Sequence, residues 1–208
     1  MMPDSYRAIE NHLDRFFGDD DTIAVFDEKV SPDFHLDVYW IQPNSSRNYH
    51  ILLTNGVSSK PMNVPDPSLD SRIELFILLP SDWPLEMDRL HDERNYWPIG
   101  LLKDLGRYPH SHGTWLGYGH TVPEGEGKTI AGTQFAATLL TKSKTLSAEF
   151  QRVPFGDSAI ELLMVFPLYG GEYAFKRAAG IAGLNAVFES KNISDIIDTS
   201  RPDACEEA

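Results

Sequence analysis

The chain has 208 residues, of which 41% are hydrophobic, and a formal net charge of −13 at pH 7. This charge disfavours direct binding to the backbones of DNA or RNA, and without a run of about 18 or more apolar residues we expect no membrane span. The length supports one sizeable core, so we expect a single domain over residues 1–208, with two small domains as the alternative.

The ends of the chain and its cysteine content bear on the compartment and on partners. The N-terminus lacks a basic segment followed by an apolar one, so we expect no secretory signal and a cytoplasmic protein. Cys205 is the only cysteine, which excludes an intrachain disulfide and agrees with a reducing compartment. Acidic residues concentrate near both ends, where they would attract basic partners; the alternative is that they only keep the protein soluble.

The first predicted element is an acidic N-terminal helix over residues 5–17. Its apolar side chains recur at helical spacing, with Asp4 as a plausible N-cap and Gly18 as a stop. Three aspartates at residues 19–21 follow as a solvated acidic loop.

A series of strands comes next. Alternation around Val38 predicts a half-buried strand over residues 34–41, and continuous apolar runs predict central strands at residues 73–79 and 160–166. Further strands are predicted at residues 22–26, 49–54 and 134–141, a loop at 58–71 and a turn at 154–156.

Three further segments complete the organisation. A helix is predicted over residues 95–107, with Pro98 in its first turn, and an aromatic, glycine-rich loop runs from there to about Gly132. A last helix over residues 172–190 should split or bend at Gly180 and Gly183, and the polar tail over 192–208 should fray. The order predicts a mixed α/β (α+β) domain, with a single mostly antiparallel or mixed sheet covered by helices.

His110, His112 and His120 are the candidate metal ligands of the aromatic loop. A His-x-His pair with a third histidine can hold zinc, although no fixed carboxylate or cysteine stands nearby in sequence. The alternative is that these rings form hydrogen bonds within the loop. The glycines match no phosphate-binding motif and no nucleophile signature occurs, so we predict no cofactor and no catalytic residue.

The aromatic side chains also have two interpretations. Trp40 and Trp83 fit the core or its edge. Four further rings either pack at the junction of helix and loop or, for some of them, face outward as anchors for a partner: Trp97, Tyr108, Trp115 and Tyr118.

With these segments laid out, the chain resembles the suppressor of fused family over most of residues 30–190, most closely its bacterial branch. The segments that carry the resemblance are LPSDWP (79–84), NYWPI (95–99), LGRYPH (105–110), TWLGYGHTVP (114–123) and ELLMVFPLY (161–169). The resemblance implies a mixed α/β domain with no known catalytic activity. The animal member sequesters a transcription factor by clamping a short peptide between this domain and a second, for which we expect no room here. Bacterial members resemble immunity proteins that neutralise polymorphic toxins, many of which are basic nucleases.

We therefore predict a non-enzymatic, suppressor-of-fused-like protein that binds and masks another protein, with a basic toxin as the first candidate partner. The predicted partner-binding residues, supplemented by acidic residues near the N-terminus, are Arg107, Tyr108, His110, Trp115, Tyr118 and His120. One alternative function is a metal-dependent hydrolase that uses His110, His112 and His120. Another is a scaffold or homodimer that buries its own aromatic face.

Overall fold

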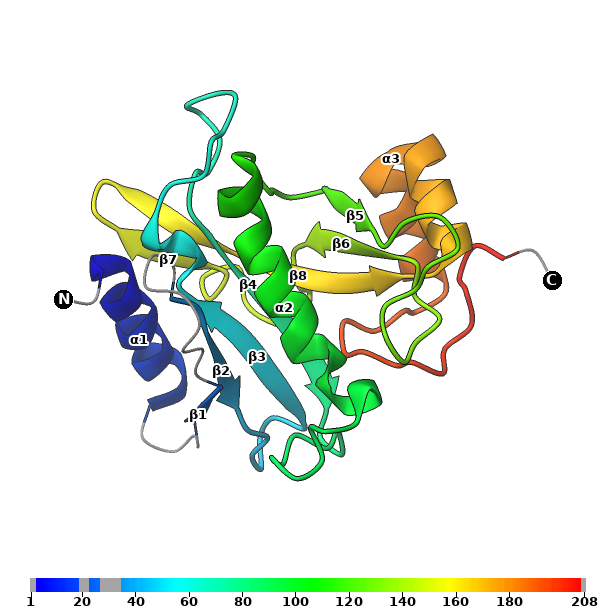
Figure 1. Ribbon diagram of the computed structural model, residues 1–208, viewed down its shortest axis with the longest axis horizontal. Helices are drawn as coiled ribbons and strands as arrows, with labels where there is room; N and C mark the ends of the chain where they lie inside the picture. Colours follow the sequence, from blue (N-terminus) through cyan, green and yellow to red (C-terminus); the bar gives the residue numbers. More distant parts are fainter. Residues whose placement is uncertain (1–2, 19–22, 27–34, 207–208) are drawn as a thin grey trace.

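The computed structural model describes residues 3–18, 23–26 and 35–206. Its helices are α1 (Asp4–Phe17), α2 (Glu93–His112) and α3 (Gly170–Ser190), with a short 3-10 turn η2 (Val57–Ser59). The strands are β1 (Ile23–Phe26), β2 (Asp37–Ile41), β3 (Tyr49–Asn55), β4 (Ile73–Pro80), β5 (Thr121–Pro123), β6 (Ala137–Thr141), β7 (Arg152–Phe155) and β8 (Ser158–Leu168). Helix α2 crosses the front of the sheet in Figure 1, and α1 and α3 lie toward its two ends.

The described strands form one mixed sheet, as predicted. Its order is β1-β2-β3-β4-β8-β6-β5, with β7 paired to β8 as a hairpin. The β4–β8 pair is parallel and the other pairs are antiparallel. The predicted central strands β4 and β8 are buried along almost their whole length, as their apolar sequences require. The short strand β5 therefore forms one edge of the sheet.

Helix α2 is longer than predicted at both ends. It begins at Glu93, with the Asp92 side chain accepting a hydrogen bond from the Arg94 N–H, so Pro98 lies beyond the first turn. It continues through the buried Pro109 to His112 and ends at Gly113, whose φ of 61° is left-handed. The prediction ended the helix at residue 107, two residues before Pro109, whose ring removes a backbone donor inside a helix. Here tertiary contacts hold the last turn, since the Nε2–H of His110 donates to the Val57 carbonyl (2.9 Å).

Two strands lie where the sequence predicted a loop or a turn. Strand β5 falls inside the predicted aromatic loop and pairs with β6 over three residues. Strand β7 occupies most of the predicted turn at 154–156 and pairs with the start of β8. Strands this short carry too little periodicity to detect in a single sequence, and long-range pairing creates them.

The C-terminal tail does not fray through residue 206. Ile197 donates its N–H to the Leu78 carbonyl (2.9 Å), and Arg201 forms an ion pair with the fully buried Glu172 of α3. The predicted break in α3 is confirmed at Gly180, which has φ 74° and ψ 178°. Helix α1 starts at Asp4, one residue before the predicted start, so the predicted cap Asp4 lies inside the helix; Pro3 takes the N-cap position and no side chain caps it. The predicted acidic loop at 19–21 and Phe34 lie outside the described residues.

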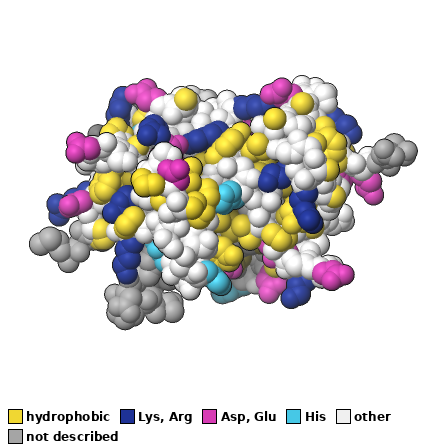
Figure 2. Space-filling model, turned by 90° about the horizontal axis from the view of Figure 1, so that it is seen from above, with side chains coloured by type: hydrophobic (Ala, Val, Ile, Leu, Met, Phe, Trp, Pro, Cys, Tyr) yellow, Lys and Arg dark blue, Asp and Glu magenta, His cyan; other side chains and the backbone are white. Residues whose placement is uncertain are grey.

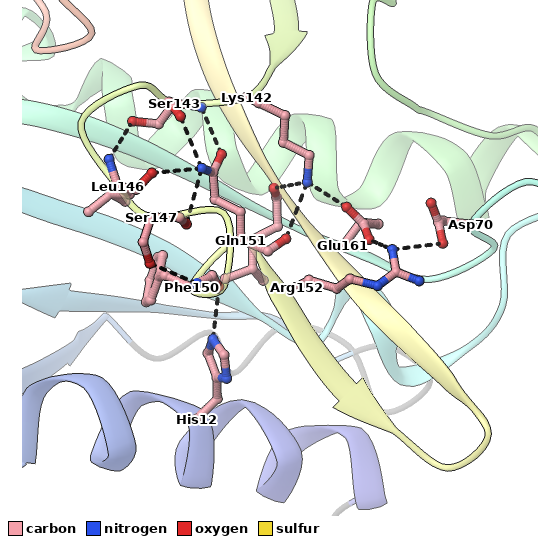
Figure 3. A network of polar contacts seen from close by, with 11 residues as sticks. His12, Asp70, Lys142, Ser143, Leu146, Ser147, Phe150, Gln151, Arg152 and Glu161 are labelled. Carbon is pink, nitrogen blue, oxygen red and sulfur yellow. Dashed lines mark hydrogen bonds and ion pairs between the residues drawn. The ribbon is translucent and has the colours of Figure 1, made fainter.

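A closed polar network ties the sheet to α1 (Figure 3). Glu161, at the start of β8, pairs with Lys142 (2.5 Å) and with Arg152. The Gln151 amide bridges the 143–147 turn by donating to the carbonyls of Ser143 (3.0 Å) and Leu146 (2.9 Å). His12 of α1 donates from Nε2 to the Phe150 carbonyl (2.8 Å). These charges and amides satisfy one another, so we read the cluster as structural.

Among the described residues, no helix combines the length and the apolar character needed to cross a bilayer.

Candidate functional site

The structure separates the six predicted partner-binding residues into two groups. Tyr108, Trp115 and His120 line one open pocket of about 430 Å³ beside β5. Arg107, His110 and Tyr118 do not line it. Arg107 lies 3.5 Å from Asp104, and the ring of His110 is hydrogen-bonded to the carbonyl of Val57 in η2. Tyr118 is 52% exposed.

The pocket beside β5 contains one residue that sequence reasoning missed. Lys176 reaches across from α3 and donates from Nζ to the Gly119 carbonyl (2.6 Å). The ring of His120 packs edge-on against Trp115 at 4.3 Å. Burial lowers the pKa of His120, and the ammonium of Lys176 lowers it further, so both favour the neutral form of the ring. Fifty-six residues separate His120 from Lys176, and no local pattern could have predicted the pair.

A second hollow, of similar volume, runs along α2 and adjoins the first. We call it the α2–β5 groove; its volume is about 410 Å³, and Tyr108 and Val122 line both hollows. One wall is formed by α2, and the other is formed by β5 and the loop after it. The α2 residues recur at spacings of three and four: Glu93, Tyr96, Trp97, Gly100, Leu101, Asp104, Leu105 and Tyr108.

That spacing defines the length and character of the groove. Fifteen helical steps from Glu93 to Tyr108 span about 22 Å at 1.5 Å per residue. Trp97 and Leu105 are almost fully buried, whereas Tyr96 and Tyr108 are 38% and 37% exposed. The groove therefore has an apolar floor and half-exposed aromatic rings at its edge. Figure 2 shows the molecule from above, with hydrophobic side chains exposed across the middle of the visible surface.

The charged side chains that line the groove are acidic. Among the described residues they are Glu93, Asp104 and Glu124, with no lysine or arginine. Burial raises the pKa of Glu124, and the nearby Asp104 carboxylate raises it further. Arg107 is the nearest ion-pair partner of Asp104, but the Asp104 side chain is 83% exposed and such pairs contribute little.

The three histidines considered as metal ligands are not brought together. His110 bonds to Val57, His112 stacks on Tyr108 with ring centroids 4.5 Å apart, and His120 packs on Trp115. In residues 3–18, 23–26 and 35–206, no group of three or more His, Cys, Asp or Glu side chains is arranged to hold a metal ion. The ligand set of the hydrolase alternative is therefore not assembled in this part of the chain.

The comparisons with known proteins identify the family. A family model described as suppressor of fused protein matches residues 32–202. The fold is similar to a crystal structure of a suppressor of fused homologue from Neisseria gonorrhoeae, with a TM-score of 0.72, 16% identity and 99% of each chain covered.

Two further solved structures share the fold. One is described as the Sufu-Fu complex, with a TM-score of 0.68, 14% identity, and 96% of this chain and 92% of that chain covered. The other is Drosophila Suppressor of Fused, with a TM-score of 0.66, 14% identity, and 97% of this chain and 51% of that chain covered. No curated protein matched the sequence.

Proposed function

The chain belongs to the suppressor of fused family, a family of protein-binding modules, and from this premise we propose that it binds and masks a partner protein through the α2–β5 groove and the adjoining pocket. The observation that carries the proposal is the continuity of the two hollows, which share Tyr108 and Val122. Together they offer a strip longer than the 22 Å or so of the α2 face, enough for about six or seven residues of extended chain.

The chemistry of the strip suits protein binding. Tyrosine, tryptophan and arginine dominate the energetics of protein interfaces, and Tyr96, Tyr108 and Trp115 all line the two hollows. The apolar floor can bury apolar side chains of a partner. The polar tips of the rings and the carboxylates at the rim can form hydrogen bonds that orient it. We assign no catalytic residue to the strip. One of the solved structures that share the fold is described as a complex of Sufu with Fu, which supports a protein as the ligand.

A finer proposal concerns the biological role. We propose that the partner is a basic toxin and that the chain is its immunity protein, acting by steric masking. The support is the net charge of −13, which speeds encounter with a cationic protein, together with the bacterial homologue of the same fold. A cytoplasmic location fits this role.

The test is affinity capture from the native host at low salt, followed by titration of each recovered protein against variants. Leu101→Arg places a long charged side chain in the groove and should abolish binding. Val25→Arg is the matched control, because Val25 is 46% exposed on β1 at the opposite edge of the sheet. Capture of no protein, or equal binding by both variants, would refute the groove as the site. Rescue of growth during co-expression with a neighbouring toxin gene tests the immunity role.

A further inference from the structure

Resting on the proposed function, we propose that the partner segment held in the α2–β5 groove carries an arginine or lysine side chain. Its aliphatic stem lies on the apolar floor, and its cationic group pairs with Glu124 and, at the rim, with Asp104. A cationic side chain is the occupant whose charge complements the acidic lining of the groove.

The floor of the groove fits the stem of a long cationic side chain. Trp97, Leu105 and Ile130 are each 4% exposed and line the groove with Leu101 and Val122. Lysine and arginine bury three or four methylene groups on such surfaces while the charged head stays at the polar margin.

The charges of the groove select the head group. Glu124 is half-buried and sits near the Asp104 carboxylate, so two like charges face one hollow that has no lysine or arginine in its lining. Like-charge proximity and partial burial both disfavour the ionised form, and a cation placed between the carboxylates reverses the first effect and compensates the second. An anionic segment would be repelled, and a neutral one would bury Glu124 further without a counter-charge.

Competition within the chain does not block this site. Arg107 is one neighbouring cation, one turn along α2 from Asp104, and its side chain is 36% exposed. Lys128 is another, since its N–H donates to the carbonyl of Gly125 (3.2 Å), the residue after Glu124, but Lys128 does not line the groove. Arg107 pairs with the exposed Asp104 at 3.5 Å. The pKa of Glu124 is raised by burial and by the Asp104 carboxylate, and both effects disfavour its ionised form. Glu124 is therefore the main anchor, and Asp104 is the secondary one.

The experiment uses a phage-displayed library of random linear peptides, panned against the full chain. Selected peptides are synthesised, and their affinities are measured by calorimetry against the wild type, Glu124→Gln, Asp104→Asn and Leu101→Arg. The matched control is Glu126→Gln, two residues from Glu124 and outside the groove lining. Each basic residue of a peptide is also replaced by citrulline, which keeps the shape of arginine and removes its charge.

We expect peptides that lose binding to Leu101→Arg to share a lysine or arginine flanked by apolar residues. Glu124→Gln should weaken them about tenfold or more, since hydrogen bonds to charged groups are worth most. Asp104→Asn should weaken them two- to threefold, and Glu126→Gln should leave them unchanged. Replacing the basic residue by citrulline should weaken binding to the wild type about tenfold and should change binding to Glu124→Gln little. This difference would show that the basic residue and Glu124 interact.

The outcomes separate this inference from the proposed function. Peptides that depend on the groove but lack a shared basic residue, or that tolerate citrulline, overturn the inference and leave the groove as a binding site. If every selected peptide binds Leu101→Arg as well as it binds the wild type, both the groove and its cationic occupant are refuted.

Discussion

Replacing Arg201 with alanine should release the C-terminal tail and lower the stability of the whole fold. The guanidinium donates to both carboxylate oxygens of Glu172, whose side chain is fully buried, and its carbon lies 4.8 Å from the centroid of the Tyr169 ring. Glu172 also accepts the N–H groups of Tyr169 (3.0 Å) and Ala204 (2.9 Å). Without Arg201, a buried carboxylate keeps two backbone donors and loses its counter-charge.

The magnitude follows from that burial. Removing one partner of a buried ion pair costs about 3–5 kcal/mol, because the remaining charge is uncompensated. In a chain of this size, 1 kcal/mol lowers the melting temperature by about 2–4 °C, so the midpoint should fall by roughly 6–20 °C. Urea denaturation and calorimetry at pH 7 measure the loss, and amide exchange at Ile197 and Ala204 reports whether the tail opens first.

An exposed ion pair provides the control. Lys144 and Glu189 are joined at 2.7 Å, but their side chains are 61% and 65% exposed. Lys144→Ala should therefore cost less than about 1 kcal/mol. If Arg201→Ala costs no more than this control, or if amide exchange in the tail is unchanged, the buried pair does not anchor the tail and the reasoning fails.

Three further predictions concern buried polar groups and one helix end. Burial lowers the pKa of His12 below its usual 6.5, so the unfolded chain binds more protons below about pH 6.5 and stability falls from pH 7 to pH 5. His12→Gln should flatten this dependence of the urea midpoint, and an unchanged slope would exclude His12 as a contributor. Glu74 is fully buried and accepts hydrogen bonds from the hydroxyl of Thr54 (2.6 Å) and from both the N–H (2.9 Å) and the hydroxyl (2.6 Å) of Ser58, so Glu74→Gln should cost about 2–4 kcal/mol in denaturant unfolding. A loss below 1 kcal/mol would contradict that account. Gly113 ends α2 with a φ of 61° and has open space around it, so alanine should cost about 1 kcal/mol and asparagine less; equal losses would point to a cause other than backbone conformation.

Much of the fold could be predicted from local patterns. The apolar stripe of α1, the continuous apolar runs of β4 and β8, and the break at Gly180 all follow from the spacing or type of residues that are neighbours in sequence. The aromatic and glycine-rich block around Trp115 likewise identified the family before any fold was known, because its residue types are specific in their order. These features depend on chemistry within a few residues, which a sequence displays directly.

The candidate site was only partly predictable. Tyr108, Trp115 and His120, which were predicted together and are close in sequence, line one pocket. Asp104, Glu124 and Lys176 were not predicted as site residues, although the spacing of Asp104 and Tyr108 on α2 was a usable signal for a shared helix face. Helix α2 itself was predicted too short, because the tertiary contact that holds its last turn, between His110 and Val57, is not visible in the local sequence.

The sequence alone therefore determined the class of fold, the family and the acidic character of the chain. Only the tertiary structure decided that α2 and β5 enclose a groove, that Lys176 reaches the Gly119 carbonyl, and that the polar tail is fixed by Glu172. The physical reason is that local periodicity sets which face of an element is apolar. Long-range pairing sets which elements face each other. Burial then determines how much a single charged residue such as Glu172 contributes to the free energy of unfolding.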